Sequence, residues 1–147
     1  MDDSQDIDTL ARTLYGEARG EGKQGMIAVA CVVVTRAMIA DEYMDAHGTQ
    51  HPLYGDGSLS SACQMPLQFS CWNQGDPNRE TIENVTGSDP SFLVALAIAQ
   101  QAENDDLEDI TDNATHYYAK GSPTPEWAIG KTACVTIGNH LFFNDID

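Results

Sequence analysis

The feature that most constrains how this chain can fold is a run of nine apolar residues, Met26 to Val34. The run is about half as long as a membrane-spanning helix requires, so we expect no membrane insertion. It lies in a longer segment, 24–40, whose three consecutive valines would also suit a strand. The length of that segment and its Ala, Met and Arg content favour a helix. The chain is therefore expected to bury this helix inside a domain.

Two further helices are predicted, one on each side of this segment in the sequence. Apolar residues recur at helical spacing through 7–18, and Asp6 and Asp8 suit the positive end of a helix dipole there. The sequence Ser-Asp-Pro at 88–90 is typical of a helix start. It predicts a buried helix through 92–103.

The segment 41–90 is rich in Gly, Ser, Asp, Asn and Pro, and only 66–72 has the character of a strand. A region this long without regular elements is usually functional, and we interpret it as one wall of a binding cleft. The part after residue 103 is mixed. Together these patterns predict a mainly helical α+β fold, a single domain over 1–147 with a long irregular middle region and a small β-hairpin.

Charge excludes one large class of partners. The chain carries 23 acidic and 7 basic side chains, a formal net charge of -16. So few cations cannot build a footprint on phosphates, which excludes nucleic acid and makes an anionic membrane a poor partner. The N-terminal sequence MDDSQDID lacks the basic start and apolar core of a signal peptide. We therefore expect the protein to stay in the cytoplasm where it is made until a separate pathway releases it.

Glu17 is the most informative polar residue, because it lies beside Leu10 and Leu14 at the margin of the first apolar stripe. Burial disfavours a charged carboxylate and raises its pKa, and the net negative charge acts in the same direction. A carboxyl group prepared in this way serves as a general acid near neutral pH. On periodicity alone, a plainer interpretation is favoured, in which Glu17 pairs with Arg12 or Arg19 and closes the helix.

Two other carboxylates are candidates to complete a glycosidase pair with Glu17. Glu21 follows four positions later, between two glycines, where a solvated loop position is the favoured interpretation. Glu126 precedes Trp127 and is the second candidate.

Aromatic residues flanked by polar ones suggest the wall of a sugar-binding cleft. The four that fit this description are Trp72, Tyr117, Tyr118 and Trp127. Packing in the core is the usual alternative for an aromatic side chain, and we accept it for Phe142 and Phe143.

His47 and His51 could be drawn as a zinc site with Cys63 and Cys71. Their spacing fits no common zinc motif, so no metal and no cofactor is expected. Cys63 and Cys71 could instead form a disulfide in an oxidising compartment, and the sequence leaves this open. The other two cysteines lie in apolar stretches and are expected to be buried free thiols.

Four blocks of the sequence resemble, in order, the SleB-like cell wall hydrolases, a family that includes spore cortex-lytic enzymes and phage endolysins. The blocks are 10–36 with its YGEARGEG segment, 63–73 with CQMPLQFSCWN, 114–118 with ATHYY, and 137–143 with IGNHLFF. Four ordered blocks that cover nearly the whole chain are more specific than any one of them. The chain departs from the family at Thr35, where Asn is usual, and at Ala119-Lys120, where Asn-Pro is common.

The resemblance implies a lysozyme-like fold and cleavage of the β-1,4 bond between N-acetylmuramic acid and N-acetylglucosamine in peptidoglycan. It implies that Glu17 is the catalytic glutamate, which replaces the ion-pair interpretation. The substrate-binding residues that we predict on this basis are Gln68, Ser70, Trp72, His116, Tyr117 and Tyr118.

With one convincing carboxylate, the predicted mechanism has Glu17 protonate the glycosidic oxygen and later take a proton back. Either the N-acetyl group or the muramic acid C6 hydroxyl could complete the reaction. Attack by the C6 hydroxyl would give a 1,6-anhydro product, and we favour this route, which is that of a lytic transglycosylase. Hydrolysis would make the enzyme a muramidase. The predicted role is a phage endolysin that reaches peptidoglycan glycan strands in the periplasm through a holin or another release pathway. The alternatives are a non-catalytic murein-binding or virion structural domain and a zinc amidase, and the sequence leaves the oligomeric state open.

Overall fold

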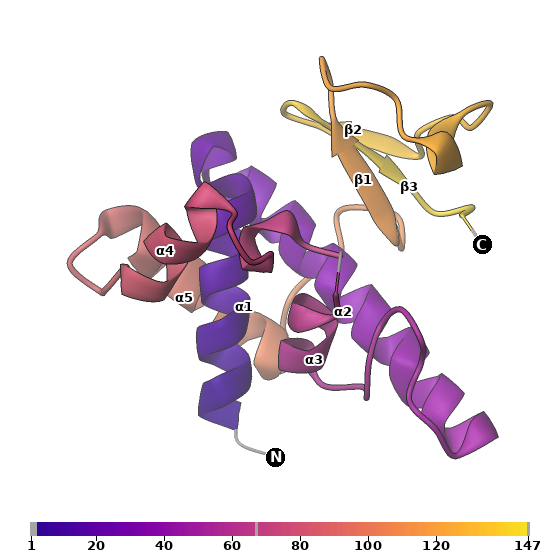
Figure 1. Cartoon of the computed structure of the whole chain (residues 1–147), viewed down its shortest axis with the longest axis horizontal. Coiled ribbons are helices and arrows are strands. Elements are labelled where there is room, and N and C mark those ends of the chain that lie inside the picture. Colours follow the sequence, from indigo (N-terminus) through magenta and orange to yellow (C-terminus); the bar gives the residue numbers. More distant parts are fainter. Residues whose placement is uncertain (1–2, 67, 147) are drawn as a thin grey trace.

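The computed structural model describes residues 3–66 and 68–146, which form five α-helices and a small antiparallel sheet (Figure 1). In chain order the elements are α1 (Asp3–Ala18), the 3₁₀ helix η1 (Arg19–Glu21), α2 (Gly22–His47), α3 (Leu59–Gln64), the 3₁₀ helix η2 (Ser70–Trp72), α4 (Pro77–Asn84), α5 (Pro90–Glu103), β1 (His116–Ala119), the 3₁₀ helix η3 (Glu126–Ala128), β2 (Val135–Ile137) and β3 (His140–Phe143). The mainly helical α+β fold predicted from the sequence is confirmed.

The long helix α2 is the centre of the fold, and it extends beyond both ends of the predicted segment 24–40. Between Met26 and Val33 nearly every side chain is buried, because other elements cover the helix on several sides. Part of the stretch 3–47 is long and apolar enough to cross a membrane by length and composition alone. Most of that window is buried inside the fold, as it is in the core helix of a globular protein.

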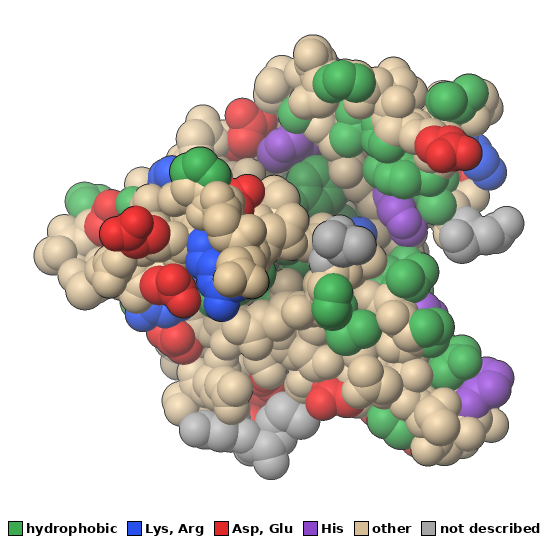
Figure 2. All heavy atoms as spheres, viewed as in Figure 1, with side chains coloured by type: hydrophobic (Ala, Val, Ile, Leu, Met, Phe, Trp, Pro, Cys, Tyr) green, Lys and Arg blue, Asp and Glu red, His purple; other side chains and the backbone are tan. Residues whose placement is uncertain are grey.

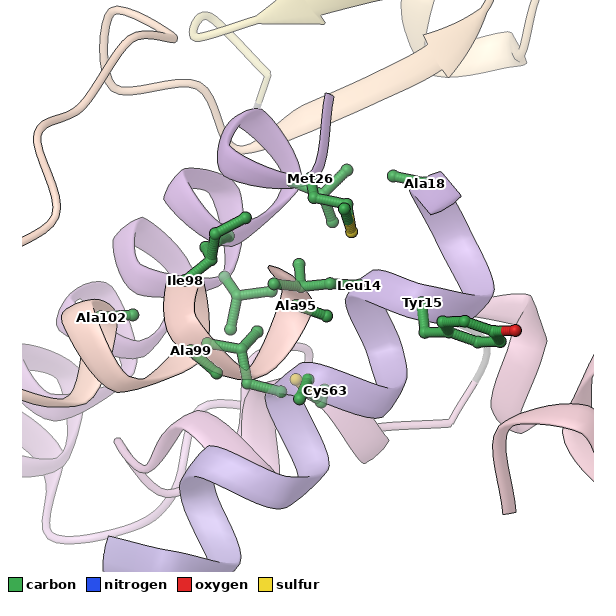
Figure 3. Packing of buried hydrophobic residues seen from close by; sticks show 14 of the residues in the cluster. Leu14, Tyr15, Ala18, Met26, Cys63, Ala95, Ile98, Ala99 and Ala102 are labelled. Atoms are coloured by element: carbon green, nitrogen blue, oxygen red, sulfur yellow. The ribbon is translucent and has the colours of Figure 1, made fainter. Parts of the chain in front are cut away.

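The helices α1, α2 and α5 share one hydrophobic core (Figure 3). Leu14 of α1 and Met26 of α2 meet Ile98 of α5 there, and small alanines on α5 let the three helices approach closely. The predicted helix start at 88–90 is confirmed, because the carboxylate of Asp89 accepts hydrogen bonds from the first amides of α5. This cap satisfies donors that a helix start leaves without partners.

The middle of the chain is more regular than predicted, because α2 continues to His47 and is followed by α3, η2 and α4. The predicted strand at 66–72 is wrong: its described residues form a turn and η2, and Leu67 lies outside the described residues. Phe69 and Trp72, three residues apart, both pack against the helical core. That spacing suits a 3₁₀ turn, whereas a strand alternates its faces every residue.

The sheet lies at the C-terminal end of the chain and has the strand order β1-β3-β2, with both pairs antiparallel. The predicted hairpin corresponds to β2 and β3, joined at Gly138, whose φ of 56° suits glycine. The sheet packs on α2, where Phe142 meets Ala28 and Val32 in a second, smaller core. Figure 1 shows the sheet set apart from the α1–α5 bundle, with α2 as the element that contacts both.

All four cysteines are free thiols in this structure. Cys31, Cys63 and Cys71 are buried, whereas Cys134 is only half-buried. The buried free thiol expected at position 31 is therefore confirmed, and the one expected at position 134 is partly exposed.

Candidate active site

A cavity of about 580 Å³ lies between the helical part and the sheet, and we call it the cleft. The helical part and the loops that follow α2 contribute Glu17, Arg36, Leu53, Gln68 and Ser70. The sheet and the loop after β1 contribute His116, Tyr117, Tyr118, Ala119, Ser122, Trp127 and His140. Figure 2 shows this face hollowed between the two parts, with hydrophobic and histidine side chains gathered on the sheet side.

Glu17 lies in the last turn of α1 and is held from both sides of the cleft. The Tyr117 hydroxyl, from β1, donates a hydrogen bond of 2.9 Å to its Oε1. The backbone N–H of Cys71, from η2, donates one of 3.3 Å to its Oε2. Neighbouring Gly16 makes this approach possible, because a Cβ there would lie 2.8 Å from the Cys71 Cβ and 2.9 Å from a methyl group of Ile82.

The arginines that could have neutralised Glu17 are engaged elsewhere. Arg12 forms an ion pair of 3.0 Å with Asp8 and donates to backbone carbonyls at the end of α4. Arg19 donates to the Tyr15 carbonyl and to the side chain of Asn78. Within the described residues, Glu17 forms no ion pair, so the ion-pair interpretation of this residue is wrong.

Arg36 is a cleft residue that the sequence analysis missed. Although charged, it is only 4% exposed, and its guanidinium lies over the rings of Tyr54 and Phe69. Its Nε donates to the Thr115 carbonyl at 2.8 Å, and its Nη1 donates to the Gln68 Oε1 at 3.4 Å. Arg36 therefore orients Gln68 and joins the chain before β1 to the helical part. A charged residue inside the apolar face of a buried helix is the signal that could have revealed it.

Burial determines the protonation states around Glu17. It raises the pKa of the Tyr117 hydroxyl well above its ordinary value, and the charge of Glu17 adds to this effect. Tyr117 therefore remains a hydrogen-bond donor at neutral pH. Burial, followed by the charge of Arg36, lowers the pKa of His116 to about 4, so that this imidazole is neutral at pH 7. Burial also raises the pKa of the Cys71 thiol, again together with Glu17.

Five of the six predicted substrate-binding residues lie in the cleft with Glu17, and the exception is Trp72. Its indole Nε1 donates to the Oγ1 of buried Thr13 at 2.8 Å, and its ring packs against the helical core. Trp127, also predicted as part of a cleft wall, does line the cleft. Its ring centroid lies 4.8 Å from that of His116 and 5.9 Å from that of Tyr118.

Neither candidate second carboxylate lines the cleft. Glu21 accepts a hydrogen bond of 2.7 Å from the backbone N–H of Asn139, which ties η1 to the turn between β2 and β3. Glu126 is exposed at the start of η3. Among the described residues that line the cleft, Glu17 is thus the only carboxylate.

The four residues considered for a zinc site are not brought together as ligands. His51 accepts hydrogen bonds from the backbone amides of Leu53 and Tyr54 through its Nδ1, and His47 contacts the Tyr43 carbonyl. Across residues 3–66 and 68–146, no group of three or more His, Cys, Asp or Glu side chains is arranged to hold a metal ion.

Comparison with known proteins assigns the chain to a family. The sequence profile of the family described as Cell Wall Hydrolase matches residues 20–143. The chain belongs to the cell wall hydrolase family. The spore cortex-lytic enzyme of Bacillus subtilis is 27% identical over 147 residues, which cover 95% of this chain and 37% of that protein. The spore cortex-lytic enzyme of Halalkalibacterium halodurans is 26% identical, with 95% of this chain and 34% of that protein covered. The chain therefore spans little more than a third of the length of these relatives.

Two solved structures have the same fold as this chain. The catalytic domain of the germination-specific lytic transglycosylase SleB from Bacillus anthracis matches with a TM-score of 0.66 and 24% identity, over 95% of this chain and 94% of that one. The catalytic domain of the Bacillus cereus SleB protein matches with a TM-score of 0.67 and 23% identity, over 96% and 91%. The fold predicted from the resemblance is thus confirmed.

Proposed function

We propose that this protein is a lytic transglycosylase that cleaves the bond between N-acetylmuramic acid and N-acetylglucosamine, with Glu17 as its single acid and base. The observation that carries the proposal is that Glu17 is the only carboxylate among the described residues of the cleft. The description of one protein of this fold as a germination-specific lytic transglycosylase supports the same reaction.

In the first step, Glu17 gives its proton to the glycosidic oxygen while positive charge develops at the sugar C1. The carboxylate left behind accepts hydrogen bonds from the Tyr117 hydroxyl and the Cys71 amide, at 2.9 and 3.3 Å. Both donors are in place before the reaction, so they stabilise the new charge without reorganising.

In the second step, the muramic acid C6 hydroxyl attacks C1 and gives its proton to Glu17. This closes the 1,6-anhydro ring, consumes no water and restores the protonated acid. A retaining hydrolase would instead need a second carboxylate about 5–5.5 Å away as nucleophile. Glu21 and Glu126 do not line the cleft, so neither is placed to serve as that nucleophile.

The identity of the products tests this reaction. Purified peptidoglycan digested with the protein should release muropeptides with anhydro ends, each lighter by one water than the hydrolysed form in mass spectrometry. Reducing ends in place of anhydro ends would make the enzyme a muramidase. Freed stem peptides with intact glycan strands would make it an amidase, and binding without soluble products would make it a murein-binding domain.

We further propose that the protein acts as a phage endolysin, which waits in the host cytoplasm until a holin or another pathway opens the way to the periplasm. The four sequence blocks shared with a family that includes phage endolysins support this role. Expression in a bacterium should lyse the cells only when a holin is co-expressed. Rapid lysis without a holin, at equal protein levels, would contradict the proposal.

A further inference from the structure

We propose that Arg36 is a positioning residue, which turns the Gln68 carboxamide so that its Nε2 donates a hydrogen bond to the acetamido carbonyl of a sugar bound in the cleft. The inference rests on the proposed function, because it takes a glycan strand as the ligand. It names the chemical group that the helical side of the cleft recognises, through a residue that the sequence analysis did not select.

The guanidinium of Arg36 is held on several sides. Its central carbon lies 5.2 Å from the ring centroid of Tyr54 and 5.1 Å from that of Phe69. Its Nε donates to the Thr115 carbonyl at 2.8 Å, which ties the chain just before β1 to α2. The side chain is buried, and no Asp or Glu among the described residues forms an ion pair with it. Because a buried charge without a counter-ion depends on such neutral partners, the guanidinium has little freedom to move.

The chemistry of the guanidinium decides which way the Gln68 amide faces. An arginine side chain only donates hydrogen bonds, whereas a glutamine amide has one acceptor oxygen and one donor nitrogen. The Oε1 of Gln68 faces Arg36, 3.4 Å from its Nη1, and the reverse orientation would bring two donors together. Since the oxygen and the nitrogen diverge from one carbon, Nε2 points away from Arg36.

The Nε2 atom of Gln68 is open to a ligand. Gln68 is half-buried and lines the cleft on the same side as Glu17. Within the described residues, Nε2 has no hydrogen-bond partner, and it is not one of the buried atoms that lack a partner, so it keeps contact with solvent. A glycan that displaces water from the cleft would therefore restore a partner to this donor.

The group that best matches this donor is a carbonyl oxygen. A carbonyl accepts hydrogen bonds and donates none, whereas a sugar hydroxyl does both. Both sugars of the proposed substrate carry an acetamido group, so a carbonyl is present on every ring of the glycan strand. The stem peptides of peptidoglycan offer other carbonyls, and removal of the acetyl groups distinguishes the two sources.

Gln68→Glu separates recognition from packing. The carboxylate keeps the shape of the amide and can still accept a hydrogen bond from Arg36, but the Nε2 protons are lost. The variant should unfold at the wild-type temperature or higher, because a charged pair replaces a neutral contact. Added to Glu17→Gln, it should bind a soluble tetrasaccharide muropeptide about tenfold more weakly in calorimetry, because one hydrogen bond is lost. Unchanged binding would overturn the inference.

The N-deacetylated form of the same tetrasaccharide muropeptide identifies the group that Gln68 binds. Without the acetamido carbonyl, Gln68→Glu should cause no loss of binding, and its carboxylate should favour the ammonium groups of the deacetylated sugars. An equal tenfold loss on both ligands would show that Nε2 pairs with another acceptor, such as a stem carbonyl. That result would overturn the assignment to the acetamido group.

A double-mutant cycle tests whether Arg36 acts through Gln68. Arg36→Met and Gln68→Met are added to Glu17→Gln, singly and together. Each should weaken binding of the N-acetylated ligand about tenfold, and the pair should also weaken it about tenfold, because both changes disable the same hydrogen bond. Losses that multiply to about a hundredfold would overturn the positioning role. If Arg36→Met fails to fold, Arg36→Lys keeps the charge without the planar fork and should show the same loss.

These binding measurements remain separate from the proposed reaction, because they are made in Glu17→Gln and do not depend on the products. Hydrolysed products from the wild type would overturn the transglycosylase reaction and leave the expected binding losses unchanged. Anhydro products together with unchanged binding in Gln68→Glu would overturn the role of Arg36 and Gln68 and leave the reaction standing.

Discussion

The helical part and the sheet contribute different chemistry to the cleft. The helical part supplies the two charged side chains among the described lining residues, Glu17 and Arg36. The sheet side supplies mostly aromatic rings, and its His116 is neutral at pH 7 because burial lowers the pKa of that imidazole to about 4. The hydrogen bond that the Tyr117 hydroxyl donates to Glu17 crosses the cleft from the sheet to the helical part. The acid therefore depends on how the two parts meet, and variants on either side of the cleft can test this dependence.

The largest effect in this comparison is expected for Tyr117→Phe, which removes the contact from the sheet to the acid. A hydrogen bond to a charged group is worth about 1.5–3 kcal/mol, so kcat/KM should fall about ten- to a hundredfold. Tyr118→Phe is the matched control, because Tyr118 also lines the cleft, whereas the hydroxyl that donates to Glu17 is that of Tyr117. Equal losses in the two variants would contradict the proposed contribution of the Tyr117 hydroxyl.

The two tryptophans test whether each side chain stabilises the helical core or binds glycan in the cleft. Trp72→Phe removes the hydrogen bond to buried Thr13 and should lower the free energy of unfolding by about 1–3 kcal/mol, with little change in the activity of the folded protein. Trp127→Phe removes part of a cleft surface and should raise KM severalfold with a smaller loss of stability. Activity assays and chemical denaturation of both variants would show the reverse pattern if Trp72, and not Trp127, stacks on the glycan.

The smallest effects are expected in the pH dependence of stability, where the two parts should act in opposite directions. In the helical part, burial and then the neighbouring Asp6 raise the pKa of Glu103 from 4.5 to about 7. The folded protein favours the protonated form of Glu103. The contribution of this group to the free energy of unfolding is therefore full below pH 4.5 and is lost as the pH rises to about 7. On the sheet side, the pKa of His116 falls from 6.5 to about 4. The contribution of the neutral imidazole is full above pH 6.5 and is lost as the pH falls toward 4.

Single variants should expose these opposing contributions. Glu103→Gln removes the loss of stability that Glu103 causes as the pH rises toward neutral. His116→Gln removes the loss of stability that His116 causes as the pH falls toward 4. The unfolding temperature of each variant is measured from pH 4 to 8 and compared with that of the wild type. The difference, variant minus wild type, should increase with pH for Glu103→Gln and decrease with pH for His116→Gln. Profiles that stay parallel to that of the wild type in both variants would contradict the assigned shifts.

The sequence predicted those elements whose signals are local. The stripe through 7–18 and the cap at Asp89 led to α1 and α5, and Glu17 was selected because it lies at the edge of that stripe. The strand at 66–72 was predicted wrongly, because η2 is fixed by packing against α1 at Gly16, a contact between distant residues. The same limitation explains why Trp72 was placed in the cleft: the direction of a side chain on a short turn depends on its tertiary neighbours.

The sequence analysis missed residues whose role depends on their burial and on their position in the cleft. Arg36 is an ordinary charged residue in the sequence, and only the structure shows it 4% exposed beneath the cleft. His140 belongs to a block used only to identify the family, and its place in the cleft beside Tyr117 becomes visible only once β3 is paired on both sides. Pairing across the sheet and contacts across the cleft are non-local, so no pattern within a short window of sequence could have indicated them.

The central claim, that one carboxylate performs the chemistry, is tested most directly by comparing Glu17→Gln with Glu21→Gln in the release of soluble fragments from purified peptidoglycan. Both replacements remove one negative charge with little change in size, and Glu21 contacts Asn139 outside the cleft. Glu17→Gln should lose activity by about a thousandfold or more while unfolding near the wild-type temperature, because the general acid and base are lost together. Glu21→Gln should keep nearly all of its activity. Substantial activity in folded Glu17→Gln, or an equal loss in Glu21→Gln, would contradict the account.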